Sequence, residues 1–319
     1  MEENLTYIDN INLDLNLDFT QERRLDNKTL ENIAKEIRKI ILKATTRAKS
    51  GHPGGSLSST DIITYLYFEF LKHNPQNPKW PLRDRFVLSK GHAAPALYAA
   101  LALCGYFPVT DLNTLRQIGS HLQGHPDMNK TPGVDMTTGS LGHGIGAGVG
   151  MALGLRLSYK AESPKVVVLL GDGEAQEGSV WEAFHTAAHY NLSNICIIVD
   201  NNNLQIDGRV DDIMNIYPLM EKLKPFGFNT IEINGHDFDQ IRHALSLFKM
   251  VSDFDKYSLE KQKEILNTLE KYNFKPYRPT FILAKTIKGK GVSFMENEVK
   301  YHGKPLSEKE LQQALKELV

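Results

Sequence analysis

Two short apolar runs, each passing directly into polar residues, constrain the fold of this 319-residue chain more than any other feature. They are residues 166–174 (VVVLLGDGE) and residues 195–203 (ICIIVDNNN). Short runs rich in β-branched residues and bounded by turn residues are typical of buried parallel strands. Ligands of open α/β sheets bind beyond the carboxyl ends of such strands. We therefore expect Asp172 and Asn202 to lie close together and to hold one cation through oxygen atoms.

Alternating strands and helices predict a single α/β domain, a doubly wound parallel sheet with helices on both faces. We assign residues 27–319 to this domain. Residues 1–26 lack helical periodicity and are predicted to form an N-terminal arm, either a tail or a segment that faces a partner. The patterns predict helices at residues 28–49, 59–72, 94–104, 239–250, 259–272 and 307–319, strands at 86–88, 230–233 and 281–285, and a loop at 50–55.

Glycines at four-residue spacing predict a smooth stripe along another helix, near residues 139–154. They are Gly142, Gly146, Gly150 and Gly154. The same spacing occurs in membrane helices, but Arg156 and Lys160 continue this one. We expect the stripe to be buried within protein.

Composition narrows the possible partners. The formal net charge is -1 and the isoelectric point is near 6.8, which gives no general reason to expect nucleic acid or an anionic membrane as a partner. No stretch reaches the ~20 apolar residues of a membrane span, and the acidic, polar N-terminus is unlike a secretory signal. We expect a cytoplasmic protein. Cys104 and Cys196 are the only cysteines, so a disulfide framework is not expected.

The order Gly-Asp-Gly-Glu followed by an asparagine pair resembles the signature of thiamine diphosphate-binding proteins, in which Mg²⁺ or Ca²⁺ is held against a diphosphate. Gly-Asp-Gly alone is typical of a turn; the second polar strand end favours a metal site. A divalent cation takes oxygen ligands. We expect the Asp172 carboxylate, the Asn202 amide oxygen and the main-chain carbonyl of Leu204 to supply them.

More extensive motifs resemble those of the N-terminal, diphosphate-binding half of transketolase, from roughly Thr29 to Ser307. They are AKSGHPGG (48–55), HNPQNPKW with RDRFVLSKGHA (83–93), GHPD (124–127), PGVDMTTGSLGHG (132–144), GDGEAQEG (171–178), DNNNLQIDG (200–208), INGHD (233–237) and YHGKP (301–305). The resemblance implies a glycolaldehyde transferase of carbohydrate metabolism and the pentose phosphate pathway.

By the same resemblance, a set of loop residues is expected to bind the cofactor. Gly139 and Leu141 should line its ring, and Gly173 its diphosphate. Glu177 and Glu182 match glutamates near the subunit interface of the family. The complete expected cofactor set is His92, Gly139, Leu141, His143, Gly171, Asp172, Gly173, Glu174, Asn202 and Leu204.

Glycine-flanked loops carry four histidines with a candidate catalytic role: His52, His92, His125 and His302. A single loop histidine is usually solvated or capping. Moving a ketol unit, however, requires proton transfers at sugar hydroxyls, to which imidazoles are suited. In transketolases the matching histidines line the substrate channel, with His125 nearest the first hydroxyl of the donor and His52 and His302 near its third carbon and the acceptor.

Two features of the histidines depart from a simple match. His143 stands where the better-known full-length enzymes have Gln, although an amide and an imidazole make similar hydrogen bonds. Glu182, His185 and His189 are spaced as zinc ligands might be on one helix face. The zincin motif needs Glu directly after the first His, where Thr186 stands; we expect these side chains to pack near an interface instead.

The resemblance also implies that half of the site lies elsewhere. The glutamate that bonds the pyrimidine ring, the ring-stacking aromatics and the residues that hold the substrate phosphate belong to a second α/β domain of the family. The sequence reaches Val319 after one last predicted helix. We therefore expect an obligate partner, a C-terminal transketolase subunit, most simply in an α₂β₂ heterotetramer.

Several alternatives stay open. The closest is a ketol transferase specialised for a modified sugar. 1-Deoxyxylulose-phosphate synthase is a weaker rival, because it lacks the PGVDMTTGSLG pattern. A non-catalytic cofactor-binding module is disfavoured by the intact Asp172, Asn202 and loop histidines. A nucleotide-binding dehydrogenase is excluded because neither G-x-G-x-x-G nor a Walker A loop occurs.

Overall fold

The computed structural model describes residues 5–11, 13, 15 and 17–319. Its centre is a sheet of five parallel strands in the order β1-β2-β3-β7-β6. The strands are β1 (Arg85–Leu88), β2 (Val166–Gly171), β3 (Ile195–Asn201), β6 (Asn229–Asn234) and β7 (Thr280–Lys285). All five strands predicted from the sequence are confirmed.

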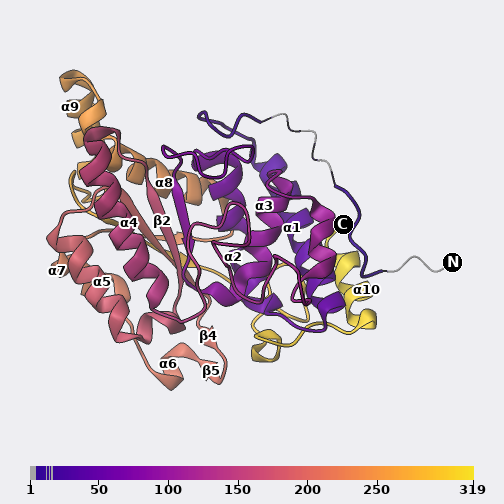
Figure 1. The fold of residues 1–319 in the computed structure, drawn as a ribbon. Coiled ribbons are helices and arrows are strands. Elements are labelled where there is room, and N and C mark those ends of the chain that lie inside the picture. The colour runs from indigo at the N-terminus through magenta and orange to yellow at the C-terminus, as the bar shows by residue number, and fades with distance from the viewer. Residues whose placement is uncertain (1–4, 12, 14, 16) are drawn as a thin grey trace.

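Helices cover both faces of this sheet, which confirms the doubly wound α/β prediction (Figure 1). Val166, Val168 and Leu170 of β2 face one core, while Val167 and Leu169 face the other. A strand buried on both sides reads as a continuous apolar run rather than an alternating one. The first core is covered by α4 (His143–Tyr159), α5 (Gly178–His189) and α7 (Leu219–Phe226), and the second by α1 (Asn27–Ala48), α2 (Pro53–Tyr65), α3 (Ala94–Leu103) and α8 (Phe238–Ser252).

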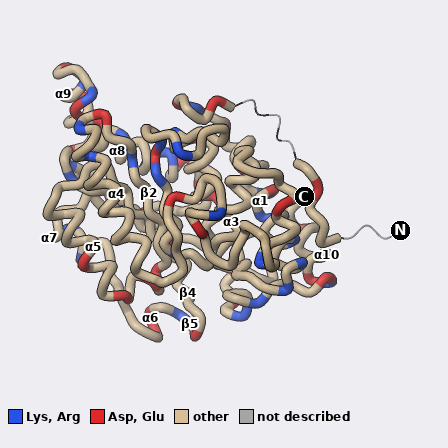
Figure 2. Tube along the Cα trace, in the orientation of Figure 1, with Lys and Arg blue, Asp and Glu red and all other residues tan. Residues whose placement is uncertain are grey.

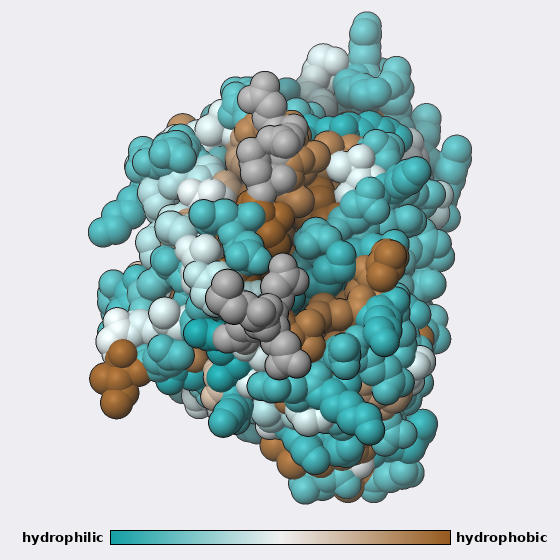
Figure 3. All heavy atoms as spheres, turned by 90° about the vertical axis from the view of Figure 1, so that its right-hand side faces the viewer, coloured by the Kyte–Doolittle hydropathy of each residue, from teal (hydrophilic) through white to brown (hydrophobic). Residues whose placement is uncertain are grey.

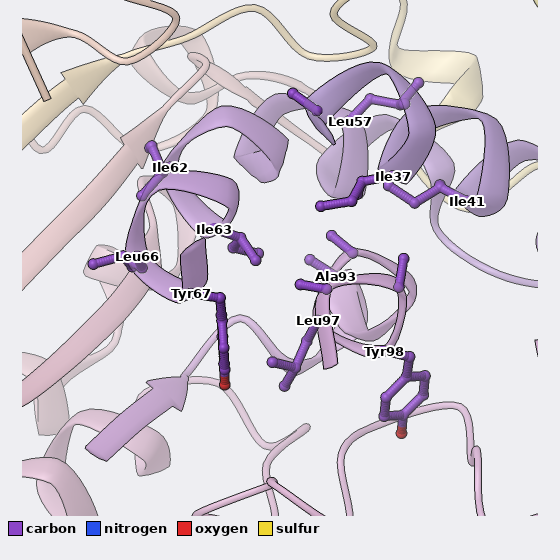
Figure 4. Packing of buried hydrophobic residues seen from close by; sticks show 14 of the residues in the cluster. Ile37, Ile41, Leu57, Ile62, Ile63, Leu66, Tyr67, Ala93, Leu97 and Tyr98 are labelled. Carbon is purple, nitrogen blue, oxygen red and sulfur yellow. The ribbon is translucent and has the colours of Figure 1, made fainter. Parts of the chain in front are cut away.

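The second core is densest where α1, α2 and α3 meet (Figure 4). Ile37 of α1, Ile63 of α2 and Leu97 of α3 are no more than 2% exposed. Close packing of this kind holds the loops at the helix ends in fixed positions. The loop between α1 and α2 carries His52, and the short turn before α3 carries His92.

The second helix begins earlier than predicted. We expected a loop over residues 50–55, but α2 starts at Pro53, which suits the first helical position because its φ is already helical. The following glycines are needed for close approach. A Cβ on Gly54 would lie 2.8 Å from the carbonyl oxygen of Tyr301. The helix ends in a π-helical turn, η1 (Leu66–Phe70).

The remaining elements are short or peripheral. The hairpin β4 (Leu204–Gln205) and β5 (Gly208–Arg209), α6 (Val210–Ile213) and α7 were not predicted from the sequence. The predicted outer helices are confirmed as α9 (Leu259–Glu270) and α10 (Glu308–Glu317), the latter with a Ser307–Glu310 capping box. The 3₁₀ turns are η2 (Gly91–Ala93), η3 (Val109–Thr114), η4 (Lys160–Glu162), η5 (Gly173–Gln176), η6 (Phe254–Lys256) and η7 (Val299–Tyr301).

The described part of the N-terminal segment lies against the domain. The backbone N–H of Ile8 donates to Asn113 Oδ1 at 2.9 Å, and Asn113 Nδ2 donates back to the carbonyl of Ile8 at 2.8 Å. Phe19 stacks on His73 with ring centroids 4.6 Å apart. Figure 3 shows apolar side chains gathered on this face amid hydrophilic surface. Residues 1–4, 12, 14 and 16 of the predicted arm lie outside the described residues.

Charges are interspersed over the trace rather than collected in one band (Figure 2), in keeping with the net charge of -1. Within the described residues, no helix combines the length and the apolar character that crossing a bilayer would require.

Candidate cofactor and active site

A cavity of about 290 Å³ lies beyond the carboxyl ends of β2 and β3. Parallel pairing places Gly171 opposite Asp200, so the two polar strand ends are brought together as expected. Most of the predicted site residues line this cavity: His52, His92, Gly139, Leu141, Gly171, Asp172, Gly173, Glu174, Glu177, Asn202, Leu204 and His302.

Asp172 is the most constrained carboxylate of the cavity. It is 3% exposed and forms no ion pair among the described residues. Its Oδ1 accepts from Gly173 N at 2.8 Å, and its Oδ2 accepts from the Asn201 side chain and from Asn203 N. Burial raises the pKa of Asp172 to about 6, assisted by the negative charge of Asp200. A nearby cation would restore the ionised form.

Two further oxygen donors stand next to Asp172. Asn202 is 7% exposed; its Oδ1 accepts from Leu204 N at 3.1 Å and retains a second lone pair. The Leu204 carbonyl accepts a hydrogen bond from Lys288 Nζ at 2.8 Å. One carboxylate, one amide oxygen and one main-chain carbonyl form a hard donor set that fits Mg²⁺ or Ca²⁺.

Lys90 and Asp200 form a fully buried ion pair beneath this donor set. Lys90 Nζ also donates to Gly55 O and Ser59 Oγ, both at 3.1 Å. Burial alone would raise the pKa of Asp200, but the charge and hydrogen bond of Lys90 outweigh it and the pKa falls. The pair therefore joins the end of β3 to the first turns of α2.

Glu174 braces the loops around the cavity. Its Oε1 accepts from Ser89 Oγ at 2.5 Å and from Gly142 N at 2.9 Å, and its Oε2 accepts from Gly171 N at 3.1 Å. Burial nevertheless raises its pKa. Three loops from different parts of the chain are thus tied to one side chain.

The four predicted histidines form one cluster. The His52 ring lies 5.4 Å from His92, 5.6 Å from His302 and 6.3 Å from His125, measured between centroids. His92 and His302 are stacked at 5.2 Å. His125 is exposed and stands at the side of the cluster, where Gly139 (φ +144°) lets its loop pass close to the imidazole.

Burial and neighbouring cations keep these imidazoles neutral. Burial lowers the pKa of His52 to about 4, with further contributions from Arg116, His125 and Lys288. Burial and the charge of Lys288 lower the pKa of His302 to about 3. The pKa of His92 is well below its usual value, and that of His125 is also lowered, mainly through burial. Neutral imidazoles are the form that can exchange protons with hydroxyl groups.

His143 and Glu182 lie apart from this cavity. Both face a separate groove of about 440 Å³ between α4 and α5, where Gly146 and Gly150 are exposed rather than covered by this chain. His185 packs on Phe226 and His189 on Tyr190. In the described part of the chain, no three His, Cys, Asp or Glu side chains are gathered as a metal centre, so no zinc site forms at Glu182.

Sequence reasoning missed three cations around the cavity. Lys90 directly precedes Gly91-His92, and Lys288 stands in the glycine-flanked run Ile287 to Gly291. Lys288 is 2% exposed, and burial lowers its pKa to about 8, with the charge of Lys90 adding to the effect. Arg116 contacts His52 across 64 residues of sequence. Only the glycines beside the lysines could have signalled close approach to a ligand.

A family model described as the thiamine diphosphate binding domain of transketolase matches residues 29–259. This chain belongs to the transketolase family. The transketolase of Campylobacter jejuni has a TM-score of 0.80 and 34% identity to it, over 92% of this chain and 43% of that one. The recognition drawn from the sequence motifs is therefore confirmed, as is the transketolase type of α/β fold.

Two relatives have nearly the same length as this chain. The 6-deoxy-6-sulfo-D-fructose transketolase subunit SqwG of Clostridium sp. (strain MSTE9) is 40% identical over 93% of this chain and 98% of its own. An apulose-4-phosphate transketolase subunit of Phocaeicola vulgatus is 36% identical over 91% and 94%. Human transketolase is 38% identical over 91% of this chain but only 42% of its own length. The chain thus corresponds to the N-terminal part of a transketolase.

Proposed function

We propose that this protein is the thiamine diphosphate-binding subunit of a two-chain transketolase, which transfers a two-carbon ketol unit from a ketose to an aldose. The observation that carries the proposal is the cavity in which Asp172, Asn202 and Leu204 meet the histidine cluster. Bound thiamine diphosphate supplies the nucleophilic carbon and electron sink that the transfer needs.

The chain's own residues take distinct tasks in this proposal. Asp172, Asn202 and the Leu204 carbonyl hold Mg²⁺ or Ca²⁺, Gly171 and Gly173 leave room for the diphosphate, and Gly139 and Leu141 line the ring. His92, His143 and Glu174 complete the proposed cofactor set, Glu174 by bracing loops. His52, His125 and His302 line the substrate channel with His92 and handle protons of the sugar hydroxyls.

A partner chain completes the site as proposed. Among the described residues that line the cavity there is no Phe, Tyr or Trp, so aromatic stacking on the ring must come from elsewhere. Relatives of matching length are named as subunits. We expect a C-terminal subunit with the pyrimidine-binding glutamate, an α₂β₂ assembly in which Glu177 and Glu182 lie near the interface, and a cytoplasmic role in carbohydrate metabolism.

A modified sugar is a specific second candidate for the substrate. The two relatives of matching length act, by their names, on 6-deoxy-6-sulfo-D-fructose and on apulose 4-phosphate. Full-length transketolases are similar to this chain at comparable identity, so both substrate classes require testing.

The test is ketol transfer by the chain co-purified with a candidate C-terminal subunit, thiamine diphosphate and Mg²⁺. Fructose 6-phosphate and 6-deoxy-6-sulfo-D-fructose serve as alternative donors. We expect transfer from at least one donor, and none from either chain alone. His125→Ala should bind cofactor normally and slow the transfer by at least about 100-fold. Metal-dependent cofactor binding without transfer from any donor would instead identify a non-catalytic module.

A further inference from the structure

Arg116 contacts the candidate catalytic cluster from outside the cofactor cavity. Its Nη1 donates to Ser50 Oγ at 2.9 Å, and its Nη2 donates to the carbonyl of Gly124 at 3.2 Å. The same Nη2 lies 3.2 Å from Nδ1 of His52. The guanidinium therefore stands between the loop of His52 and the loop that leads to His125.

The chemistry of this contact leaves one assignment. A guanidinium in a protein stays protonated and offers only donors. Nδ1 of His52 must therefore be the acceptor and cannot carry a proton. A neutral imidazole with Nδ1 free of hydrogen holds its proton on Nε2.

We propose that Arg116 is a positioning residue that fixes His52 as the Nε2–H tautomer, so that His52 offers the sugar a hydrogen-bond donor rather than a base. The inference rests on the proposed function for the identity of the ligand, a sugar hydroxyl or carbonyl oxygen. His52 lines the cavity, and its Nε2 makes no hydrogen bond within the described residues.

The backbone around Arg116 is built to hold the guanidinium still. Arg116 has φ +61°, in the left-handed region that non-glycine residues rarely adopt, and its N–H donates to the carbonyl of Leu122 at 2.8 Å. A Cβ on Gly124 would lie 3.2 Å from the Arg116 Cζ. Only glycine lets the guanidinium lie directly on this stretch of main chain.

The charged and titratable groups facing His52 all favour its neutral form. They are Arg116, His92, His125, His302 and Lys288. Arg116 itself forms no ion pair with a carboxylate anywhere in residues 17–319, so its charge acts on the cluster undiminished. Proton acceptance then falls to another imidazole, and His125 is the member whose side chain makes no hydrogen bond in the described structure and is exposed.

The test reads the tautomer directly. Nitrogen NMR of the full chain with ¹⁵N-labelled histidine, assigned through loss of one signal in His52→Gln, should show Nδ1 unprotonated and Nε2 protonated between pH 5 and 8. Arg116→Leu should give a mixture of tautomers and a pKa that rises toward the usual value of about 6.5. Arg116→Gln retains an uncharged donor and should retain the Nε2–H tautomer.

Arg47→Leu is the matched control, because Arg47 is also half-buried but donates to the carbonyl of Asn113 and not to a histidine. It should leave the His52 signals unchanged. In the complex, Arg116→Leu should lower kcat by at least about tenfold with cofactor affinity intact, and Arg116→Gln should recover most of the loss.

A proton on Nδ1 in the wild type, or identical His52 signals in the wild type and Arg116→Leu, would overturn the assignment. The NMR measurement needs neither partner nor sugar, so that result would leave the proposed ketol transfer standing. Conversely, a complex without transfer activity would remove the proposed function while the tautomer remained measurable.

Discussion

Lys288 donates a hydrogen bond to the carbonyl of Leu204 at 2.8 Å, the same oxygen that we assign to the metal. The ammonium also lies 2.7 Å from Nδ1 of His302. A divalent cation on Leu204 must therefore displace Lys288, which is free to turn toward the diphosphate. The lysine opposes the metal when it is alone and favours the anion that accompanies it.

Lys288→Met should consequently have opposite effects on two ligands. Mg²⁺ alone should bind more tightly, because a like charge and a competing donor are removed. Inorganic diphosphate should bind more weakly by about tenfold, or ~1.4 kcal/mol. Calorimetric titration with each ligand measures both. Lys290→Met, which loses only a partly exposed pair with Glu296, is the control; equal changes in the two variants would contradict the role of Lys288.

Asp172→Asn should abolish metal-dependent cofactor binding while leaving the domain folded. The amide keeps the size of the side chain but lacks the negative charge, and charge removal costs little because burial and Asp200 already disfavour ionisation. Affinity for thiamine diphosphate with Mg²⁺ should fall at least about 100-fold, or ~2.7 kcal/mol. Calorimetry with the partner present checks this. Unchanged affinity would show that the metal lies elsewhere.

Two glycines of α4 should respond to alanine with opposite signs. A Cβ on Gly150 meets nothing within 4 Å, whereas a Cβ on Gly148 would lie 2.5 Å from Val168 Cγ2. Gly150→Ala should stabilise the isolated chain by about 0.5–1 kcal/mol through helix propensity. Gly148→Ala should destabilise it by about 1–3 kcal/mol through overpacking. Urea denaturation measures both, and stabilisation by Gly148→Ala would contradict the packing against β2.

Acid should weaken the fold through Asp61. Burial raises its pKa, but the charge and hydrogen bonds of Arg38, together with the hydrogen bond of His236, lower it to about 2. Because the folded pKa lies below the ordinary 3.8, the stabilisation is complete above pH 4 and is lost as pH falls from about 4 to 2.

Comparing Asp61→Asn with the wild type across this range tests the assignment. The variant leaves Arg38 buried without its partner, so we expect a loss of about 3 kcal/mol at pH 7. The loss should shrink toward pH 2 as the wild type becomes protonated. Glu36→Gln, which removes a half-exposed pair with Lys39, should change stability by less than about 0.5 kcal/mol. A difference between Asp61→Asn and wild type that did not depend on pH would contradict the shifted pKa.

Much of the fold followed from local patterns because each pattern had one physical cause. The runs at 166–170 and 195–199 were predicted as strands because they are apolar on both faces, and both faces are indeed covered by helices. The start of α2 was missed because two glycines after Pro53 read as a loop. Their close approach to Tyr301 and His92 involves residues far away in sequence.

The candidate site divides in the same way. Asp172 and Asn202 were assigned from strand ends, since adjacent parallel strands place their carboxyl ends together. Lys288 was not, because a lysine between glycines resembles an exposed loop until the end of β7 is seen to lie beside Leu204. Arg116 carried no local signal at all, since its contact with His52 depends on the packing of two separate loops.

The strand order has a consequence for biosynthesis. β6 pairs only with β7, and β7 occupies the position between β3 and β6 although it is the last strand in the chain. While the ribosome is still translating, β3 keeps an open edge and β6 has no neighbour until residue 285 has emerged. A nascent chain interrupted before that point exposes two strand edges at once, which makes it a natural client for chaperones and a poor candidate for expression as a shorter fragment.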